Sequence, residues 1–313
     1  MIKKLITILL LTLILSSFGT SAMAAEKLTL MLDWFPNVDH LPIYVARHQG
    51  FFAQQGLDIE IISPSETSDA LKLAAAGTVD IAISYEPQTI IAAARGLQIT
   101  VMGRLIEHPL ATLLFLKGEG IESPGDLNGK KIGYTVPGLY DVLLVAFARL
   151  NGIEQYSAVN VGFAIVQSLT AGKVDAVMGP FKTYETVTMA QKGIAVGYFE
   201  LEKWGIPDYD ELVLVASHKT MKKNKAAMSK ISRIIDQAIQ YVRANPEKAL
   251  EHYFEQVPEA DREIERGAFE LTLPYYARHQ TLDVNRWQQF ADFALKYGLI
   301  DKPVDAKSIL FSK

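Results

Sequence analysis

The sequence predicts a two-lobed α/β protein whose sheets are rich in parallel strands and carry helices on both faces. The chain has 313 residues, which is enough for two domains of ordinary size. Short apolar strands alternate with helical segments in its first part. Leu73–Ala82 and Leu169–Val177 each show the end of a helix, a glycine stop and a strand that opens with Val-Asp. The period of this repeat is far too long for a solenoid, so it favours two similar lobes.

The first lobe opens with a strand, a polar-aromatic loop and a helix, at Leu28–Leu32, Asp33–Asn37 and Leu41–Gly50. The amides at the start of such a helix point at the loop, so these three elements predict a ligand cradle. Further elements are expected in this order: a strand at Leu57–Ile62, a helix at Asp69–Ala76, a strand at Val79–Ile83, a helix at Thr89–Arg95, and strands at Ile99–Leu105 and Thr112–Leu116.

A second strand, loop and helix follow at Lys131–Tyr134, Thr135–Leu139 and Tyr140–Leu150, and predict a second cradle. Lys117–Gly129 is rich in glycine and proline and is the predicted first crossing between the lobes, with Val213–Ser217 as the return. These crossings assign residues 25–117 and 217–313 to lobe 1, and residues 118–216 to lobe 2. The remaining helices, at Met221–Ala244 and from Pro246 onward, are expected to pack on lobe 1.

Composition excludes several classes of function. The net charge of −4 argues against a nucleic-acid partner, which would need a basic face. The absence of cysteine excludes disulfides, thiolate nucleophiles, iron–sulfur clusters and thiolate zinc sites. The six histidines include no His-x-x-x-His pair, and there is neither a Gly-x-Ser-x-Gly elbow nor a P-loop. We therefore expect no catalytic residue, no metal ion and no cofactor.

Residues 1–24 predict a cleaved signal peptide. A basic start at Met1–Lys4 precedes the apolar segment Leu5–Leu15, and Ala22-Met23-Ala24 supplies a small-x-small cleavage site. The apolar segment is too short to span a bilayer comfortably, and a lipid anchor would need a cysteine that the chain lacks. We therefore expect the mature chain to be a monomer that is free in a periplasm.

The stretch LDWFPNVDHLPIYVARHQGFF, residues 32–52, resembles the opening of mature periplasmic binding proteins for thiamine-pyrimidine precursors. The same opening is found in the yeast-type enzyme that makes the thiamine pyrimidine. SPGDLNGKKIGY at 123–134 resembles the lobe crossover of many solute-binding proteins, and residues 299–304 resemble the family's C-terminal signature. This resemblance implies a type II periplasmic-binding-protein-like fold with the ligand cleft between the lobes. It also implies an ABC permease in the inner membrane as partner.

Candidate ligand residues follow the predicted strands, because ligands of such proteins bind at the carboxyl ends of parallel strands. The candidates combine aromatic rings with a few carboxylates, and Lys182 is their one basic neighbour. Such a set suits a flat, neutral or weakly basic heteroaromatic ring, and does not suit nitrate, sulfonate or phosphate. The selected residues are Asp33, Trp34, Asn37, His40, Tyr85, Glu86, Gly138, Tyr140, Tyr184 and Glu185; Asp39, Pro137, Asp141 and Phe181 hold similar positions.

One motif adds detail to the second lobe. GPFKTYE, residues 179–185, resembles the element of pyrimidine-binding relatives in which an aromatic residue and a glutamate contact the aminopyrimidine. This resemblance implies ligand contacts for Tyr184 and Glu185. Each candidate also has a structural interpretation: Trp34 could fill the core of a lobe, and Asp33 could cap the turn at Pro36.

The main alternative to a binding protein is the related hydroxymethylpyrimidine phosphate synthase. In the alignment that the resemblance implies, the enzyme's donor histidine falls at Gln88 and its lysine falls at Ser84, so neither residue type is present. The enzyme's cysteine-rich motif is absent as well. A riboflavin binder and a sulfonate or nitrate binder remain as further alternatives, of which the anion binders have the less suitable site chemistry.

Overall fold

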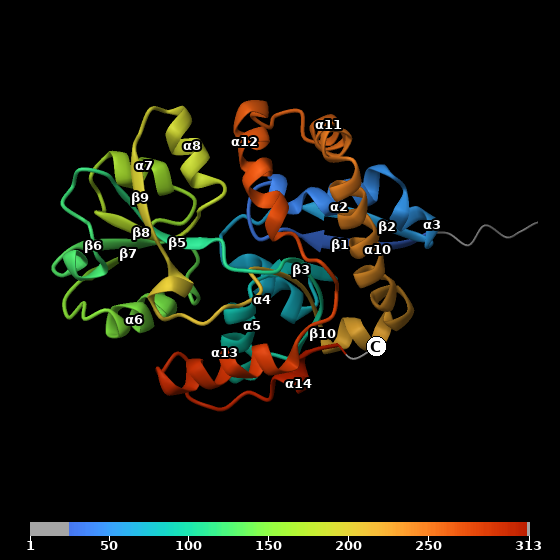
Figure 1. Ribbon diagram of the computed structural model, residues 1–313. Coiled ribbons are helices and arrows are strands. Elements are labelled where there is room, and N and C mark those ends of the chain that lie inside the picture. Colours follow the sequence, from blue (N-terminus) through green and yellow to red (C-terminus); the bar gives the residue numbers. More distant parts are fainter. Residues whose placement is uncertain (1–24, 312–313) are drawn as a thin grey trace, which may run out of the picture.

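The computed structural model describes residues 25–311, so the predicted signal peptide lies outside the described residues. The described part of the chain forms two five-stranded sheets, each within its own lobe (Figure 1). Across this part of the chain, no helix has both the length and the apolar character needed to cross a membrane.

Lobe 1 contains the sheet β2-β1-β3-β10-β4. Its strands are β1 (Glu26–Met31), β2 (Leu57–Ile62), β3 (Ile81–Ser84), β4 (Ile99–Ile106) and β10 (Leu212–Ser217). Its helices are η1 (Val38–His40), α2 (Leu41–His48), α3 (Phe51–Gln54), α4 (Asp69–Ala76), α5 (Glu86–Ala94), α9 (His218–Lys223), α10 (Lys225–Ala244), α11 (Pro246–Gln256), α12 (Arg262–Thr272), η4 (Leu273–Tyr275), α13 (Val284–Lys296) and α14 (Ala306–Ile309).

Lobe 2 contains the sheet β7-β6-β8-β5-β9. Its strands are β5 (Ala111–Leu116), β6 (Lys131–Tyr134), β7 (Ser157–Asn160), β8 (Ala176–Phe181) and β9 (Val196–Glu200). Its helices are η2 (Pro124–Leu127), α6 (Tyr140–Leu150), α7 (Ile165–Thr170), α8 (Glu185–Gln191) and η3 (Leu201–Trp204).

The two sheets share one design, which confirms the prediction of two similar lobes. In each sheet three parallel strands, β2-β1-β3 or β7-β6-β8, are followed by an antiparallel strand, β10 or β5. The two Val-Asp segments occupy equivalent places at the starts of β3 and β8. Asp80 accepts a hydrogen bond from the Thr29 amide (2.9 Å), and Asp175 accepts one from the Lys131 amide (2.7 Å). Both aspartates therefore join neighbouring strands at the end of the sheet where β3 and β8 begin.

The predicted crossings between the lobes are wrong. The strand β5 pairs with β8 and β9, so the chain already leaves lobe 1 between Ile106 and Ala111, before the glycine-rich segment. Val213–Ser217 is not a crossing either, because it belongs to β10 and pairs with β3 and β4. The return lies between η3 and β10. A short apolar strand has the same pattern in either lobe, so the sequence did not show to which sheet β5 and β10 belong.

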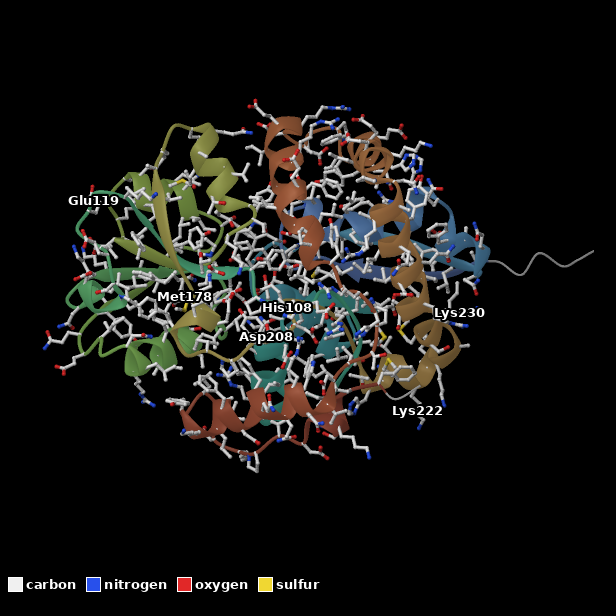
Figure 2. All side chains as sticks on the ribbon, in the orientation of Figure 1. His108, Glu119, Met178, Asp208, Lys222 and Lys230 are labelled. Atoms are coloured by element: carbon white, nitrogen blue, oxygen red, sulfur yellow. The ribbon has the colours of Figure 1, made fainter. Side chains whose placement is uncertain are left out.

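The two crossings lie side by side and are tied together by one exposed pair of polar side chains and one buried carboxyl. His108 and Asp208 form a hydrogen bond of 2.9 Å between them (Figure 2). The Glu211 carboxylate accepts hydrogen bonds from the amides of Leu110 and Ala111 (2.5 and 2.8 Å), and burial raises its pKa to about 7. Buried, hydrogen-bonded carboxyls of this kind fix the place where the two lobes meet.

The long helix predicted for Met221–Ala244 is two helices, α9 and α10, which meet at Asn224. The apolar face of α10, which includes Ile231 and Ile235, is buried against α2 and β4. The first cradle forms as predicted, because β1 leads into the loop before η1 and α2. Its helix stops at Gly50, which adopts φ +69° between α2 and α3.

Candidate functional site

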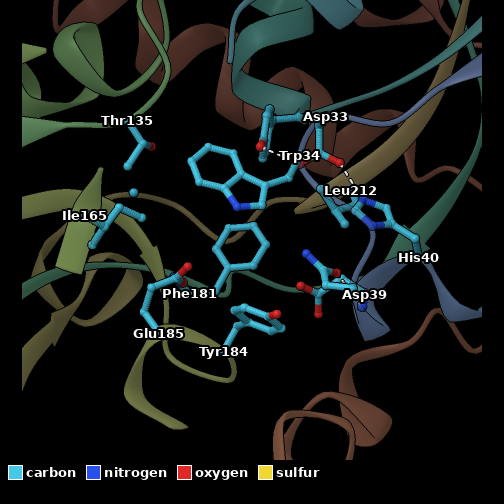
Figure 3. Close-up of a pocket in the computed structure, with 13 residues that line it drawn as sticks. Asp33, Trp34, Asp39, His40, Thr135, Ile165, Phe181, Tyr184, Glu185 and Leu212 are labelled. Carbon is cyan, nitrogen blue, oxygen red and sulfur yellow. Dashed lines mark hydrogen bonds and ion pairs between the residues drawn. The ribbon is translucent and has the colours of Figure 1, made fainter. Parts of the chain in front are cut away.

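A cavity lies between the lobes, at the carboxyl ends of β1 and β6 (Figure 3). Its volume is about 20 Å³. That is room for about one water molecule. The lining residues are Asp33, Trp34, Asn37, Asp39, His40, Tyr85, Thr135, Ile165, Gly179, Phe181, Tyr184, Glu185 and Leu212.

Asp33 organises the lobe 1 wall of the cavity. It follows β1, and its carboxylate accepts a hydrogen bond of 2.6 Å from the Tyr85 hydroxyl and lies 2.9 Å from Nε2 of His40. All three side chains are buried. Burial and the neighbouring Asp33 raise the pKa of Tyr85 well above its usual range, so the phenol keeps its proton and donates a hydrogen bond to Asp33.

Asp39 brings a second carboxyl to the same wall. Asn37 caps η1 by accepting a hydrogen bond from the Asp39 amide (2.8 Å), and this cap fixes the backbone from which Asp39 projects. One carboxyl oxygen of Asp39 accepts a hydrogen bond from Thr272 (3.1 Å), whereas the buried Oδ2 has no partner among residues 25–311. Burial raises the pKa of Asp39 to about 7. An unpaired buried oxygen of this kind is suited to a ligand that donates a hydrogen bond.

Glu185 supplies the carboxyl of the lobe 2 wall. It is the first residue of α8, and its Oε2 accepts a hydrogen bond from the Phe181 amide (2.7 Å). Burial raises the pKa of Glu185 to about 7, and the backbone hydrogen bonds lower it only in part. The carboxyl faces the cavity from the side opposite Asp33 and Asp39 (Figure 3).

Tyr184 and Glu265 connect the lobes beside the cavity. The Tyr184 hydroxyl, at the start of α8 in lobe 2, donates a hydrogen bond of 2.9 Å to the Glu265 carboxylate of α12 in lobe 1. The other oxygen of Glu265 accepts from the Val38 amide (2.9 Å), in the cavity loop itself. Burial raises the pKa of Glu265 to about 7. One buried carboxyl thus joins the lobe 1 cradle to the lobe 2 wall.

Aromatic rings fill the middle of the cavity and its rim. The Trp34 indole and the Phe181 ring both line the cavity (Figure 3). The indole also contacts Phe163 of lobe 2, with ring centroids 4.6 Å apart, and Phe35 lies 4.4 Å from the same phenylalanine. Trp34 packs against the small apolar cluster of lobe 2 as well. Trp34 therefore both lines the cavity and joins the lobes.

Seven of the ten selected residues line the cavity, namely Asp33, Trp34, Asn37, His40, Tyr85, Tyr184 and Glu185. The other three are not among its lining residues. Glu86 begins α5, and its carboxylate accepts a hydrogen bond from the Asp210 amide (2.7 Å). Tyr140 donates to Glu211 (3.2 Å) behind the cavity, and the Gly138 amide donates to Asp141 in the first turn of α6. All three residues lie near the carboxyl ends of strands, as predicted, but Glu86 and Tyr140 form hydrogen bonds with residues of the crossing and Gly138 forms one with α6.

Several lining residues were not selected from the sequence. Asp39 and Phe181 stood in the wider set, and Thr135 follows β6, where the strand-end rule could have found it. Gly179 adopts φ +114°, and a Cβ there would lie 2.2 Å from Oγ1 of Thr135 and 2.7 Å from the Tyr140 ring. Ile165 and Leu212 carry no local sequence signal.

Two sheets of this order with a cavity between them define a periplasmic-binding-protein-like fold. An alkanesulfonate-binding protein from Xanthomonas axonopodis superimposes with a TM-score of 0.73 at 16% identity, covering 92% of this chain and 99% of the other. A Candida albicans protein described as having the generic periplasmic binding protein fold gives a TM-score of 0.72 at 18% identity, covering 91% and 96%.

The chain belongs to the NMT1/THI5-like family, which matches residues 37–249. A relative named as a thiamine biosynthesis protein of Haemophilus influenzae is 39% identical, over 91% of each chain. A formylaminopyrimidine-binding protein of Halalkalibacterium halodurans is 28% identical over 99% of this chain and 98% of its own. A 4-amino-5-hydroxymethyl-2-methylpyrimidine phosphate synthase of Saccharomyces cerevisiae is also 28% identical, over 89% and 85%. The family therefore contains both binding proteins and enzymes.

Proposed function

We propose that this chain is the substrate-binding component of an ABC importer and captures a thiamine pyrimidine precursor, of the hydroxymethylpyrimidine or formylaminopyrimidine type, in the periplasm. The supporting observation is the composition of the cavity wall. Among the described residues, those that line the cavity include three carboxyls, Asp33, Asp39 and Glu185, and no lysine or arginine. Lys182, the basic candidate, is held by Glu200 and Glu202 at 2.8 and 2.9 Å instead.

This wall suits an aminopyrimidine better than an anion. A carboxyl can accept a hydrogen bond from an exocyclic amine and share a proton with a ring nitrogen. In the proposed complex Glu185 pairs with the aminopyrimidine edge, Asp39 accepts a further donor, and Trp34 or Tyr85 packs on the ring. A sulfonate would meet carboxyls here, whereas its recognition requires cationic groups or amide nests.

Ligand entry requires movement in this scheme. The cavity volume of about 20 Å³ is too small for a pyrimidine ring. The two short crossings allow the lobes to hinge apart, and Trp34, Tyr184 and Phe163 then separate from their partners in the opposite lobe.

The proposal treats the chain as a binding protein without turnover. The positions that the synthase resemblance assigns to the donor histidine and the lysine are Gln88 and Ser84, which hydrogen-bond to each other (2.9 Å) and are not among the cavity-lining residues. A single-turnover assay with pyridoxal phosphate and iron should therefore yield no pyrimidine, and product formation would overturn this part of the proposal.

The deciding experiment is calorimetric titration of the mature chain with hydroxymethylpyrimidine and formylaminopyrimidine, with riboflavin and an alkanesulfonate as competing classes. We expect saturable binding of at least one pyrimidine and none of the sulfonate. Failure of both pyrimidines to bind, or tighter binding of riboflavin or the sulfonate, would refute the ligand class. Native mass spectrometry of protein purified without refolding would identify any ligand that the chain retains.

A further inference from the structure

Two histidines and a glutamate meet on lobe 1, outside the cavity. His48 is the last residue of α2, whereas His252 and Glu255 lie one turn apart on α11. The helices α2 and α11 pack together, and α11 lies on the side of α12 that faces away from lobe 2 (Figure 1). Each of the three residues offers a ligand atom, and these atoms all lie within 4.8 Å of one another.

The hydrogen bonds of this cluster show which nitrogen of His252 can bind a metal ion. Nε2 of His48 lies 2.8 Å from the Glu255 carboxylate. Nε2 of His252 accepts a hydrogen bond from the side-chain amide nitrogen of Gln49 (2.9 Å) and lies 3.1 Å from the Tyr241 hydroxyl. Because an amide nitrogen can only donate, Nε2 carries the lone pair of the neutral His252 ring and Nδ1 carries its proton. Nε2 is therefore the His252 atom that can bind a metal ion in place of the Gln49 contact.

The imidazoles are close enough to act together. The His48 and His252 rings stack with centroids 3.9 Å apart and an interplanar angle of 17°. Stacked lone pairs do not converge on one point, so one ring must turn. The His48 and Glu255 side chains are 30% and 63% exposed, and such side chains can turn at small cost.

We propose that His48, His252 and Glu255 form a binding site for a divalent transition-metal ion such as Zn²⁺. Two imidazole nitrogens and one carboxylate oxygen are a donor set that zinc accepts together with a water molecule. Ca²⁺ and Mg²⁺ prefer oxygen donors, so the two histidines disfavour them. The bound ion joins α2 to α11. His48 and His252 lie far apart in the sequence, which is why a search for His-x-x-x-His pairs did not find this site.

The test is a zinc titration of the untagged mature chain after treatment with a chelator, followed by calorimetry, with Co²⁺ absorption as the reporter of coordination. We expect one ion per chain and a rise in the melting temperature on zinc addition. His48→Ala and Glu255→Gln, both at exposed positions, should each lose at least about ten-fold in affinity, as should His252→Ala.

His108→Ala is the matched control, because His108 pairs with Asp208 at 2.9 Å on the surface without a second histidine. Its zinc affinity should equal that of the parent. Circular dichroism verifies that each variant is folded. Equal zinc affinity of the parent and both His48→Ala and Glu255→Gln would overturn the proposal, as would equal affinity for Mg²⁺ and Zn²⁺. None of these measurements depends on the pyrimidine ligand.

Discussion

Glu185 gives the sharpest test of the proposed recognition, because its pairing with an aminopyrimidine requires a proton. The carboxyl accepts from the exocyclic amine, and one proton is shared between the other oxygen and the ring nitrogen, whichever atom carries it. Burial raises the pKa of Glu185 to about 7, so the free protein already holds this proton below pH 7. Above pH 7 the proton must be taken up on binding.

The magnitude follows from this linkage. Uptake of one proton weakens binding by about ten-fold for each pH unit above the pKa, which is about thirty-fold between pH 6 and pH 8.5. Glu185→Gln presents a donor N–H and an acceptor C=O without a titrating proton, so this variant should bind at pH 6 like the parent and lose the pH dependence. Glu185→Ala removes the pairing and should cost roughly 1–3 kcal/mol at pH 6.

Calorimetry at four pH values between 6 and 8.5, with the pyrimidine that binds the parent more tightly, measures the effect. The pKa of Asp39 is also raised to about 7, so Asp39→Asn is measured in parallel. This variant should retain the part of the pH dependence of binding that Glu185 causes. Glu60→Ala, on the exposed face of β2, is the control and should behave like the parent. A Glu185→Gln variant with the parental pH slope would refute the reasoning, as would a parent whose affinity does not change above pH 7.

Three further predictions follow from the contacts between the lobes and within the cavity. Tyr184→Phe should weaken ligand binding by about ten-fold through faster dissociation, because it removes the hydrogen bond to Glu265 that joins the lobes. A double-mutant cycle with Glu265→Gln should give a coupling energy of about 1 kcal/mol or more, and zero coupling would contradict a stabilising role of this hydrogen bond. Tyr198→Phe, at an exposed tyrosine, is the control and should leave binding unchanged. The raised pKa values of the buried carboxyls mean that the native state binds more protons than the unfolded state, so the free energy of unfolding should fall as pH rises from about 5 through about 7. Urea unfolding should show a smaller fall for Asp39→Asn, and an identical pH profile would argue against this contribution. X-ray scattering should show compaction on ligand addition, which an unchanged radius of gyration at saturation would exclude.

Local rules predicted the parts of the site that lie close together in the sequence. Asp33, Trp34 and His40 were found because they follow a strand and precede a helix, and Tyr85 was found by the same rule. Glu86 does not line the cavity for a physical reason: α5 begins at Glu86 rather than at Thr89 as predicted, and the Glu86 carboxyl accepts a hydrogen bond from the Asp210 amide at the crossing.

Residues that act through tertiary packing could not be found in this way. Glu265 lies more than two hundred positions from Val38, and its burial between Val38 and Tyr184 depends on how α12 packs on η1 and α8. The residues of the proposed metal site likewise lie on two helices, α2 and α11, that meet only in the folded protein. The crossings were misplaced because strand patterns show that β5 and β10 are apolar, but not which sheet receives them.

The late arrival of β10 also sets the order in which the lobes can be completed. All strands of lobe 2 come from one continuous stretch, residues 111–200, whereas β3 and β4 of lobe 1 become neighbours of a common strand only when residues 212–217 are present. Until then both strands have apolar, unpaired edges, which favour association with other chains. A nascent chain that ends before Leu212 can therefore form the whole sheet of lobe 2 but only the β2-β1-β3 part of the sheet of lobe 1. The first cradle, although it is synthesised first, is therefore among the last parts to gain its contacts, because Val38 and Asp39 pair with Glu265 and Thr272 near the end of the chain.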